Sequence, residues 1–560
     1  MEKIWLKEYP EGVPSDVDIH AYSSLKEILE KSCERFRDLP AYGNMGVTVT
    51  YGELDRASRN FGAYLQKDLG LKKGDRLAIM LPNLLQYPVV LFGALRAGLT
   101  VVNTNPLYTT RELEHQLKDS GAVAIVVLEN FANTLQQVIH KTLIKTVITT
   151  QVGDLFPAMK AMLTNLVVKH IKKMVPRWRI AGTVRLRQAL RSGAKQTLAD
   201  VALGHDDIAF LQYTGGTTGL AKGAVLTHGN MVANVQQSSA WIAKDLLDGK
   251  EIAILPLPLY HIYALNANLM FMKIGAHIIL ITNPRDMPTF IEELKRTKFT
   301  AIIGVNTLYN ALLNAPGFSA VAAHTLKMTN AGGMAVQRAV AEKWKQVTGV
   351  AIMESYGLTE TAPAAISNPV NIKDWTGTIG LPIPSTEAAI LDDAGDEMPI
   401  GKVGEICIRG PQVMKSYWNQ PDETAKVFTG EGWFRTGDMG FMDQRGYFKI
   451  TDRKKDMILV SGFNVYPNEV EDVVMMHPGV LEVAAIGAPD EKSGEVVKIV
   501  VVKKDPDLTT EELLAHCRKQ LTGYKMPRII EFRTEPLPKT NVGKVLRRLL
   551  RDQSAEKSPR

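Results

Sequence analysis

Short apolar runs alternate with helical patterns along roughly the first 380 residues, and this alternation limits the fold more than any other feature. Such runs are buried when they form a parallel sheet whose faces are covered by helices. Helical stretches such as 108–121 lie between the runs. The runs that we expect to form strands are 76–81, 101–106, 122–128, 251–258, 277–281, 300–305 and 326–333. The pattern predicts an α/β fold with mostly parallel sheets.

The pattern changes near Pro382, where the runs become shorter and turns such as DDAGDE and DQRG join them. After Asp456 we expect helices at 467–477 and 509–521 and strands at 480–489 and 498–504. A length of 560 residues leaves room for about three to four domains. We therefore expect a large N-terminal domain of layered α/β sheets at 1–454, which includes a β-rich subdomain at about 382–454, and a small α+β C-terminal domain at 455–560.

Residues 77–95 form an uncharged run of 19 residues, which approaches the length of a membrane span. Two prolines, an asparagine and a glutamine interrupt it, so we expect a buried strand, a turn and a buried helix. The N-terminus has no apolar signal-peptide core, which favours a cytoplasmic protein. The three cysteines are far apart and form no metal-binding pattern, which favours a reducing compartment: Cys33, Cys407 and Cys517.

A basic stretch at 160–195 carries ten lysines and arginines, and no acidic residue lies between Asp154 and Asp200. Apolar residues and Trp178 are interleaved with these charges. This pattern suits a helix on an anionic membrane surface, so we expect peripheral attachment to the inner face of the cell membrane. The alternative is a solvated basic face. Nucleic acid is not an expected partner, because no recognition module accompanies the stretch.

A glycine- and threonine-rich loop, YTGGTTGLAKG, occupies residues 213–223. Glycines let backbone amides approach a ligand, threonine hydroxyls donate further hydrogen bonds, and Lys222 adds a positive charge. The Walker pattern requires Gly-Lys-Ser/Thr, whereas Ala221 precedes Lys222 here and Gly223 follows it. The loop predicts an anion site outside the Walker class, with a flexible surface turn as the alternative.

Four further motifs accompany the loop: SYGLTE at 355–360, GWFRTGD at 432–438, TDRKKDMILVSGFN at 451–464 and PKTNVGK at 538–544. Together they resemble the adenylate-forming acyl-CoA synthetases, which share a fold with firefly luciferase and peptide-synthetase adenylation domains. The resemblance covers about residues 20–550. It is strongest to bacterial long-chain fatty-acid–CoA ligases, on stretches such as NPLYTTRELEHQLKDSGA, PLPLYHIYAL and ITNPRD.

The resemblance implies a reaction in two halves that uses ATP, Mg²⁺ and coenzyme A. The carboxylate of a long-chain fatty acid attacks the α-phosphate of ATP and gives an acyl adenylate and pyrophosphate. The thiol of coenzyme A then attacks the adenylate and expels AMP.

The resemblance also implies which residues hold the nucleotide, the metal and coenzyme A. Glu360 corresponds to the glutamate that is linked to magnesium, and Thr214 is a second expected metal contact. Asp438 corresponds to the ribose ligand, since its two acceptor oxygens match a pair of neighbouring hydroxyls. The remaining expected contacts are Gly215, Gly216, Thr217, Thr218, Gly219, Lys222, Gly332, Tyr356, Gly357, Thr359, Arg453 and Gly462.

Lys544 and His261 are the residues expected beside the reacting carboxylate. A lysine directed at the α-phosphate stabilises the charge that develops there, and Lys544 matches the family position better than Lys539. His261 lies in the PLYHIY motif. We expect it to position groups rather than to act as a base, because a carboxylate is already ionised at pH 7.

The resemblance implies a C-terminal domain that rotates between the two half-reactions. Lys455 falls at the hinge position, where many relatives carry aspartate. After rotation Gly462 faces the site and leaves room for the pantetheine arm of coenzyme A.

Several alternatives stay open at this stage. The acid is long-chain by resemblance only, so a ligase for medium-chain or aromatic acids is an alternative, as is acyl transfer to an acyl carrier protein. A luciferase-like monooxygenase has no positive sign in the sequence. A kinase or ATPase would give ADP, and an inactive acyl-binding protein would have lost Lys544, Glu360 or Asp438. The oligomeric state is open, with a homodimer as one option.

Overall fold

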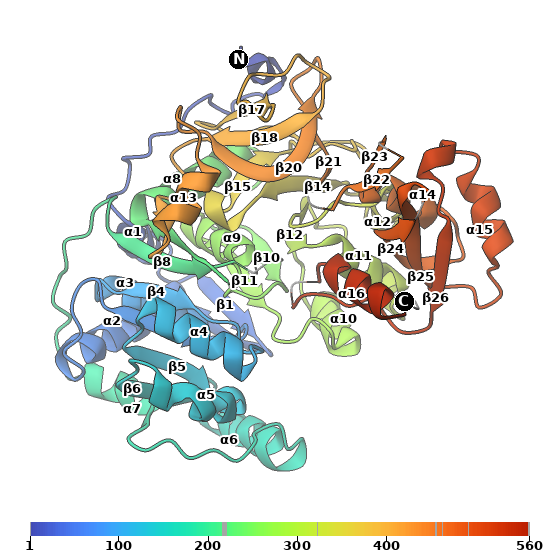
Figure 1. Cartoon of the computed structure of the whole chain (residues 1–560). Helices are drawn as coiled ribbons and strands as arrows, with labels where there is room; N and C mark the ends of the chain where they lie inside the picture. The colour runs from blue at the N-terminus through green and yellow to red at the C-terminus, as the bar shows by residue number, and fades with distance from the viewer. Residues whose placement is uncertain are drawn as a thin grey trace.

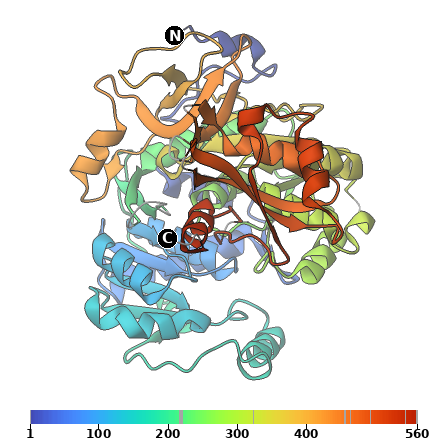
Figure 2. The ribbon, with the colours of Figure 1, turned by 45° about the vertical axis from the view of Figure 1, so that its right-hand side comes forward.

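The computed structural model describes residues 2–214, 221–321, 323–453, 456–461, 463–490, 492–541 and 543–557. Two large sheets and a smaller one, with the helices that cover them, build the N-terminal part of the described chain (Figure 1). The C-terminal part lies against one side of this assembly, next to α11 and α12 (Figures 1 and 2).

One large sheet has the order β19-β9-β8-β4-β3-β5-β6-β7. The strands from β8 to β7 run parallel, whereas β9 and β19 are antiparallel. Their bounds are β3 (Arg76–Met80), β4 (Thr100–Asn103), β5 (Ala124–Leu128), β6 (Thr146–Thr150), β7 (Val184–Arg185), β8 (Ile208–Tyr213), β9 (Gly223–Thr227) and β19 (Ser416–Tyr417).

The other large sheet has the order β16-β15-β14-β13-β12-β10-β11-β1-β2, and its strands from β14 to β1 run parallel. The seven strands expected from the sequence are confirmed as β3, β4, β5 and β10 to β13, all in parallel pairings. The bounds in this sheet are β1 (Pro40–Asn44), β2 (Val47–Thr50), β10 (Ile252–Leu255), β11 (His277–Leu280), β12 (Ala301–Gly304), β13 (Met328–Ala331), β14 (Ile352–Gly357), β15 (Ala364–Ser367) and β16 (Leu381–Pro382).

Helices connect these strands, and several begin at threonine capping boxes, where the side chain of the cap and that of the third helical residue satisfy each other's backbone amides. Their bounds are α1 (Leu25–Arg35), α2 (Tyr51–Lys67), α3 (Gln86–Arg96), α4 (Thr110–Ser120), α5 (Ala132–Val138), α6 (Ala158–Leu166), α7 (Leu186–Gly193), α8 (His228–Ile242), α9 (Ile262–Lys273), α10 (Met287–Arg296), α11 (Asn306–Asn314) and α12 (Arg338–Thr348).

The uncharged run at 77–95 forms β3, a turn and α3, and all of it is buried except the partly exposed Pro82 of the turn, as expected from the prolines within it. None of the described helices combines the length and the apolar character that a membrane span requires. All three cysteines are free thiols within buried parts of the fold: Cys33, Cys407 and Cys517.

The β-rich texture after Pro382 corresponds to an antiparallel sheet with the order β17-β18-β20-β21. The long strand β20 and the short helix α13 were not expected, because the stretch 421–442 has no clear alternation of apolar and polar residues. The bounds are β17 (Glu387–Leu391), β18 (Gly404–Arg409), α13 (Pro421–Val427), β20 (Phe434–Met442) and β21 (Phe448–Arg453).

The C-terminal part builds its own apolar core, which includes Val470, Val474 and Ile499. The two strands and two helices expected there are present, and β22, β23, β26 and α16 are additional. The bounds are β22 (Ile458–Val460), β23 (Phe463–Val465), α14 (Pro467–Met475), β24 (Val480–Asp490), β25 (Gly494–Lys503), α15 (Thr510–Cys517), β26 (Ile529–Arg533) and α16 (Arg547–Lys557). Lys455, the expected boundary, lies outside the described residues.

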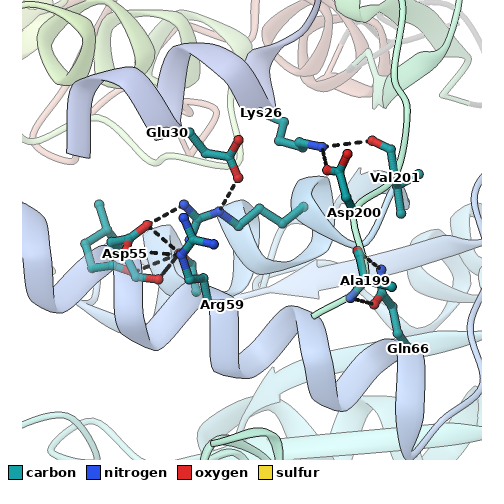
Figure 3. A network of polar contacts seen from close by, with 11 residues as sticks. Lys26, Glu30, Asp55, Arg59, Gln66, Ala199, Asp200 and Val201 are labelled. Carbon is teal, nitrogen blue, oxygen red and sulfur yellow. Dashed lines mark hydrogen bonds and ion pairs between the residues drawn. The ribbon is translucent and has the colours of Figure 1, made fainter. Parts of the chain in front are cut away.

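A polar network ties the first helices together and fastens the chain that leads into β8 (Figure 3). The Arg96 side chain of α3 is fully buried and forms ion pairs with Asp55 of α2 and Glu30 of α1. Lys26 and Gln66 of the same two helices hold residues 199–201 by hydrogen bonds (Figure 3). The segment after the basic stretch is therefore fixed to the body of the protein.

We expect Arg96→Met to lower the free energy of unfolding by about 3 kcal/mol, because it leaves the partly buried Asp55 carboxylate without its buried partner. Arg59→Met is the matched control. Arg59 is half exposed and pairs with the same aspartate, so its loss is expected to cost less than about 1 kcal/mol. Urea unfolding of both variants measures the difference, and equal losses would contradict this account.

Candidate functional site

The site residues stand where parallel strands end. The glycine-rich loop follows β8, Gly332 follows β13, and Tyr356 and Gly357 complete β14. In α/β sheets, ligands bind in the crevice beyond the carboxyl ends of the strands. The topology of the two large sheets therefore brings these segments to one region.

Glu360 lies in the turn after β14, and its side chain is largely buried. Its Oε1 accepts a hydrogen bond of 2.6 Å from the Tyr417 hydroxyl, and its backbone oxygen accepts one from Met414. Oε2 has no hydrogen-bond partner among the described residues. A carboxylate oxygen of this kind is the hard ligand that Mg²⁺ prefers, so Glu360 fits a metal contact.

Lys222, near the end of the glycine-rich loop, lies over the ring of Tyr417, the residue that donates to Glu360. Its ammonium group pairs with Glu423 of α13 and lies 4.9 Å from the centre of the Tyr417 ring. Thr214, at the other end of the loop, donates its backbone amide to the Lys222 carbonyl at 2.9 Å. The five expected contacts between them lie outside the described residues: Gly215, Gly216, Thr217, Thr218 and Gly219.

Asp438 forms a second cluster with Tyr356 and Arg453. The Tyr356 hydroxyl donates to Asp438 Oδ2 at 2.6 Å, and Arg453 Nε lies 3.0 Å from Oδ1. The pairing of β20 with β21 places Asp438 opposite Arg453. Burial, then the Asp438 charge, raises the pKa of Tyr356 well above its usual range, so Tyr356 keeps its proton and acts as a donor.

Neighbouring atoms leave little or no room for a side chain at two glycines of the site. A Cβ on Gly357 would lie 1.8 Å from the Pro363 carbonyl oxygen, so only glycine fits this position. A Cβ on Gly332 would lie 3.2 Å from the Ser355 carbonyl oxygen and 3.3 Å from the Tyr263 ring. Thr359 begins the turn that contains Glu360.

His261 caps α9 and accepts the Tyr263 amide on Nδ1 at 3.3 Å. Burial, and after it the positive charge of Lys544, lowers the pKa of His261 to about 4. Lys544, from the C-terminal part of the chain, is thus one of the groups that act on His261, the residue that directly precedes α9. Lys539, the competing lysine, instead pairs with Glu482 of β24. Gly462 lies outside the described residues.

Sequence reasoning did not identify Tyr417 or Glu423, which contact Glu360 and Lys222. Both belong to the stretch 416–427, which has no spacing that points to a ligand. Asn330 was expected only as part of the strand at 326–333, yet its side chain also organises the ends of β13 and β14. It donates to the Met353 carbonyl at 3.1 Å and to the Ser355 hydroxyl at 2.7 Å, and it accepts from Tyr263.

The sequence pattern of AMP-binding enzymes matches residues 29–418, and that of the AMP-binding enzyme C-terminal domain matches residues 469–544. The chain belongs to the AMP-binding enzyme family. It is 55% identical to the long-chain-fatty-acid–CoA ligase of Escherichia coli O6:H1 over 558 residues, which are 100% of this chain and 99% of that protein. The enzyme of the same name from Yersinia pestis is also 55% identical, with 99% of each chain covered.

Solved structures of the family show the same fold. The crystal structure of the anthranilate CoA ligase AuaEII in complex with anthranoyl-AMP superimposes with a TM-score of 0.85 at 25% identity, over 96% of this chain and 99% of that one. The resemblance to adenylate-forming acyl-CoA synthetases inferred from the motifs, and the α/β fold that it implies, are thereby confirmed.

We expect His261→Gln to slow adenylate formation by roughly tenfold to hundredfold, and by the same factor at every pH from 5.5 to 8. A pKa of about 4 means that His261 is neutral throughout this window, so it contributes shape and polarity and no titrating charge. The measurement is the rate of ATP–pyrophosphate exchange at each pH, expressed as the ratio of the wild-type rate to the rate of His261→Gln. A ratio that falls toward one below pH 6.5 would mean that His261 acts as a base with an ordinary pKa.

Proposed function

We propose that this protein joins a long-chain fatty acid to coenzyme A in an ATP- and Mg²⁺-dependent reaction that passes through an acyl adenylate. The observation that carries the proposal is the position of Lys544. This lysine comes from the C-terminal part of the chain, and Thr307 of α11, in the N-terminal part, donates its hydroxyl at 3.0 Å to the carbonyl of Gly543, the residue directly before Lys544. The positive charge of Lys544 also contributes, after burial, to the lowered pKa of His261. The identity of 55% to long-chain-fatty-acid–CoA ligases supports the choice of acid.

The nucleotide would lie between the two clusters. Asp438 would accept the ribose hydroxyls, with Arg453 orienting the carboxylate. Tyr356 would lie against adenine. Lys222 would exchange Glu423 for the β- and γ-phosphates, together with the hydroxyls and amides of the glycine-rich loop. Glu360, with Thr214 as a second contact, would hold Mg²⁺, which neutralises the phosphate charge.

In the first half-reaction the fatty-acid carboxylate attacks the α-phosphorus and pyrophosphate leaves. Negative charge increases on the α-phosphate oxygens in the transition state. The Lys544 ammonium stabilises this charge without giving up a proton, and His261 stays neutral beside it. Since the carboxylate is already ionised, no general base is required.

In the second half-reaction the thiol of coenzyme A attacks the acyl carbonyl and AMP leaves. We propose that the C-terminal domain at 455–560 rotates about Lys455 between the two steps, so that Lys544 departs and Gly462 faces the site. A separate core in this part of the chain suits movement as a unit.

We expect Lys544→Ala to reduce adenylate formation with C12 to C18 acids by roughly 10²- to 10³-fold, since a preorganised charge at the transition state is removed. Thioester formation from supplied acyl adenylate should stay near the wild-type rate. Pyrophosphate exchange measures the first step, and acyl-CoA release measures the second. Lys519→Ala, which changes an exposed lysine of the same domain, is the control.

Equal losses in both half-reactions would contradict the role of Lys544. AMP formation by the wild type with only medium-chain or aromatic acids would keep the mechanism and change the substrate class. Transfer to an acyl carrier protein in place of coenzyme A would change the acceptor.

We further propose that the protein is cytoplasmic and binds the inner face of the cell membrane through residues 160–195. α6 carries apolar side chains at positions i, i+3, i+4 and i+7, and the stripe faces solvent: Met159, Met162, Leu163 and Leu166 are 83%, 68%, 62% and 47% exposed. Exposed apolar stripes mark sites of interaction. α6 lies at the outer edge of the molecule in both views (Figures 1 and 2).

Most basic side chains of residues 160–195 lack a carboxylate partner among the described residues. Lys169 lies 3.6 Å from Glu129, and Lys160 donates to the Met45 carbonyl. The other eight basic side chains of the stretch have no carboxylate partner within the described part of the chain: Lys172, Lys173, Arg177, Arg179, Arg185, Arg187, Arg191 and Lys195. Such cations are available to anionic lipid headgroups, each worth about 1 kcal/mol near the surface.

We expect a double variant, Met162→Gln with Leu163→Gln, to bind anionic vesicles more than tenfold more weakly, because each buried CH₂ contributes about 0.8 kcal/mol. Co-sedimentation with vesicles measures binding, and pyrophosphate exchange with a soluble acid should be unchanged. Leu247→Gln, at another exposed leucine, is the control. Unchanged vesicle binding, with a dimer in the wild type that the double variant loses, would assign the stripe to a homodimer instead.

A further inference from the structure

Helix α11 has two faces of different chemistry. Leu308, Tyr309 and Leu312 are buried and pack into the main core. The opposite face presents the side chains at positions i, i+3, i+4 and i+7: Thr307, Asn310, Ala311 and Asn314. We call these four residues the α11 outer face. Helix α11 itself lies next to the C-terminal part of the chain (Figure 1).

Three side chains of the α11 outer face form hydrogen bonds with the C-terminal part. The Thr307 hydroxyl donates to the Gly543 carbonyl at 3.0 Å. Asn310 Nδ2 donates to the Leu481 carbonyl at 3.1 Å. Asn314 Oδ1 accepts from the Lys504 ammonium at 3.1 Å. One face of one helix thus contacts three separate segments of the C-terminal part.

The two asparagines, Asn310 and Asn314, are connected by a hydrogen bond between their side chains. Asn314 Nδ2 donates to Asn310 Oδ1 at 2.9 Å, so the amide of Asn310 is oriented with its NH₂ group toward Leu481. Leu481 lies at an irregularity in the pairing of β24 with β25, where Val480 and Glu482 pair and Leu481 does not. A bulge of this kind leaves a residue outside the ladder, and its carbonyl is the acceptor that Asn310 uses.

Contacts at both ends fix the loop that carries Lys544. Glu482, next to Leu481, pairs with Lys539 and accepts the Leu537 amide at the start of the loop. At its end, Gly543 has a φ of +87°, and a Cβ there would lie 2.7 Å from Thr307 Oγ1. Thr307 therefore contacts the residue that directly precedes Lys544.

We propose that the α11 outer face holds the C-terminal domain in the orientation that forms the adenylate, with Thr307 and Asn310 as positioning residues for Lys544. The proposal rests on the role of Lys544 under the proposed function. It assigns to α11 the task of fixing where the ammonium group stands. Neither residue takes part in the chemistry.

Polar contacts suit a surface that must also release its partner. The side chains of Thr307 and Asn310 are partly exposed and Asn314 is exposed, so water can replace each bond when the domain leaves. Interfaces between moving domains resemble transient protein–protein contacts in this respect. The loss of one bond should shift the balance between orientations without unfolding either domain.

Thr307→Val tests the contact, because valine keeps the shape of threonine and removes the donor. We expect adenylate formation to fall by roughly 3- to 10-fold, the effect of one lost hydrogen bond, and thioester formation from supplied acyl adenylate to be unchanged or faster. Asn310→Leu should behave in the same way. Thr307→Ser restores the hydroxyl and should restore the rate of pyrophosphate exchange.

Ala311→Ser changes the same face at a residue without a hydrogen bond to the C-terminal part, and should leave both half-reactions at the wild-type rate. The thermal midpoint of each variant checks that the fold is intact. Equal losses in both half-reactions, no loss in either, or failure of Thr307→Ser to restore exchange would overturn the inference. If Lys544→Ala abolishes exchange while Thr307→Val does not affect it, the proposed function stands and only the role of α11 falls.

Discussion

The direction of the parallel strands is the constraint on which the whole site depends. The loops that follow β8, β13 and β14 start at the carboxyl ends of these strands. In α/β sheets such loops lie close together, so the backbone alone brings their side chains into one region. The glycine-rich loop, Gly332 and Glu360 are each the continuation of a strand that is buried for other reasons. The core therefore places the reactive groups, and the antiparallel pair of β20 and β21 adds Asp438 and Arg453 to them.

Charge compensation inside the site follows from this convergence. Glu360 accepts a hydrogen bond from Tyr417, and Lys222 forms an ion pair with Glu423. Asp438 forms an ion pair with Arg453 and accepts a hydrogen bond from Tyr356. These three charged groups therefore already have hydrogen-bond or ion-pair partners within the protein. A bound nucleotide exchanges these partners for its own groups, which limits the desolvation cost of an empty site.

Much of the fold and several site residues could be predicted from sequence for a physical reason. Buried parallel strands read as continuous apolar runs, so β3 to β5 and β10 to β13 were all expected. Residues such as Asp438 and Lys544 lie in motifs that resemble those of the family, and their roles stay predictions. The structure was needed to find three further residues, because each contacts its partner across a long separation in sequence: Tyr417, Glu423 and Thr307. No local sequence pattern predicts a contact of that kind. The solvent-facing stripe of α6 also required the structure, because its periodicity alone predicts a buried face.

The burial of the cysteines has a consequence for product fidelity. An acyl adenylate acylates any thiolate that reaches it, the protein's own included. Burial raises the pKa of Cys33 and Cys407 to about 12 and that of Cys517 to about 11, so all three stay protonated at neutral pH. Because these buried thiols stay protonated, the acyl adenylate does not acylate the protein's own cysteines. The acyl group is therefore transferred to the thiol of coenzyme A.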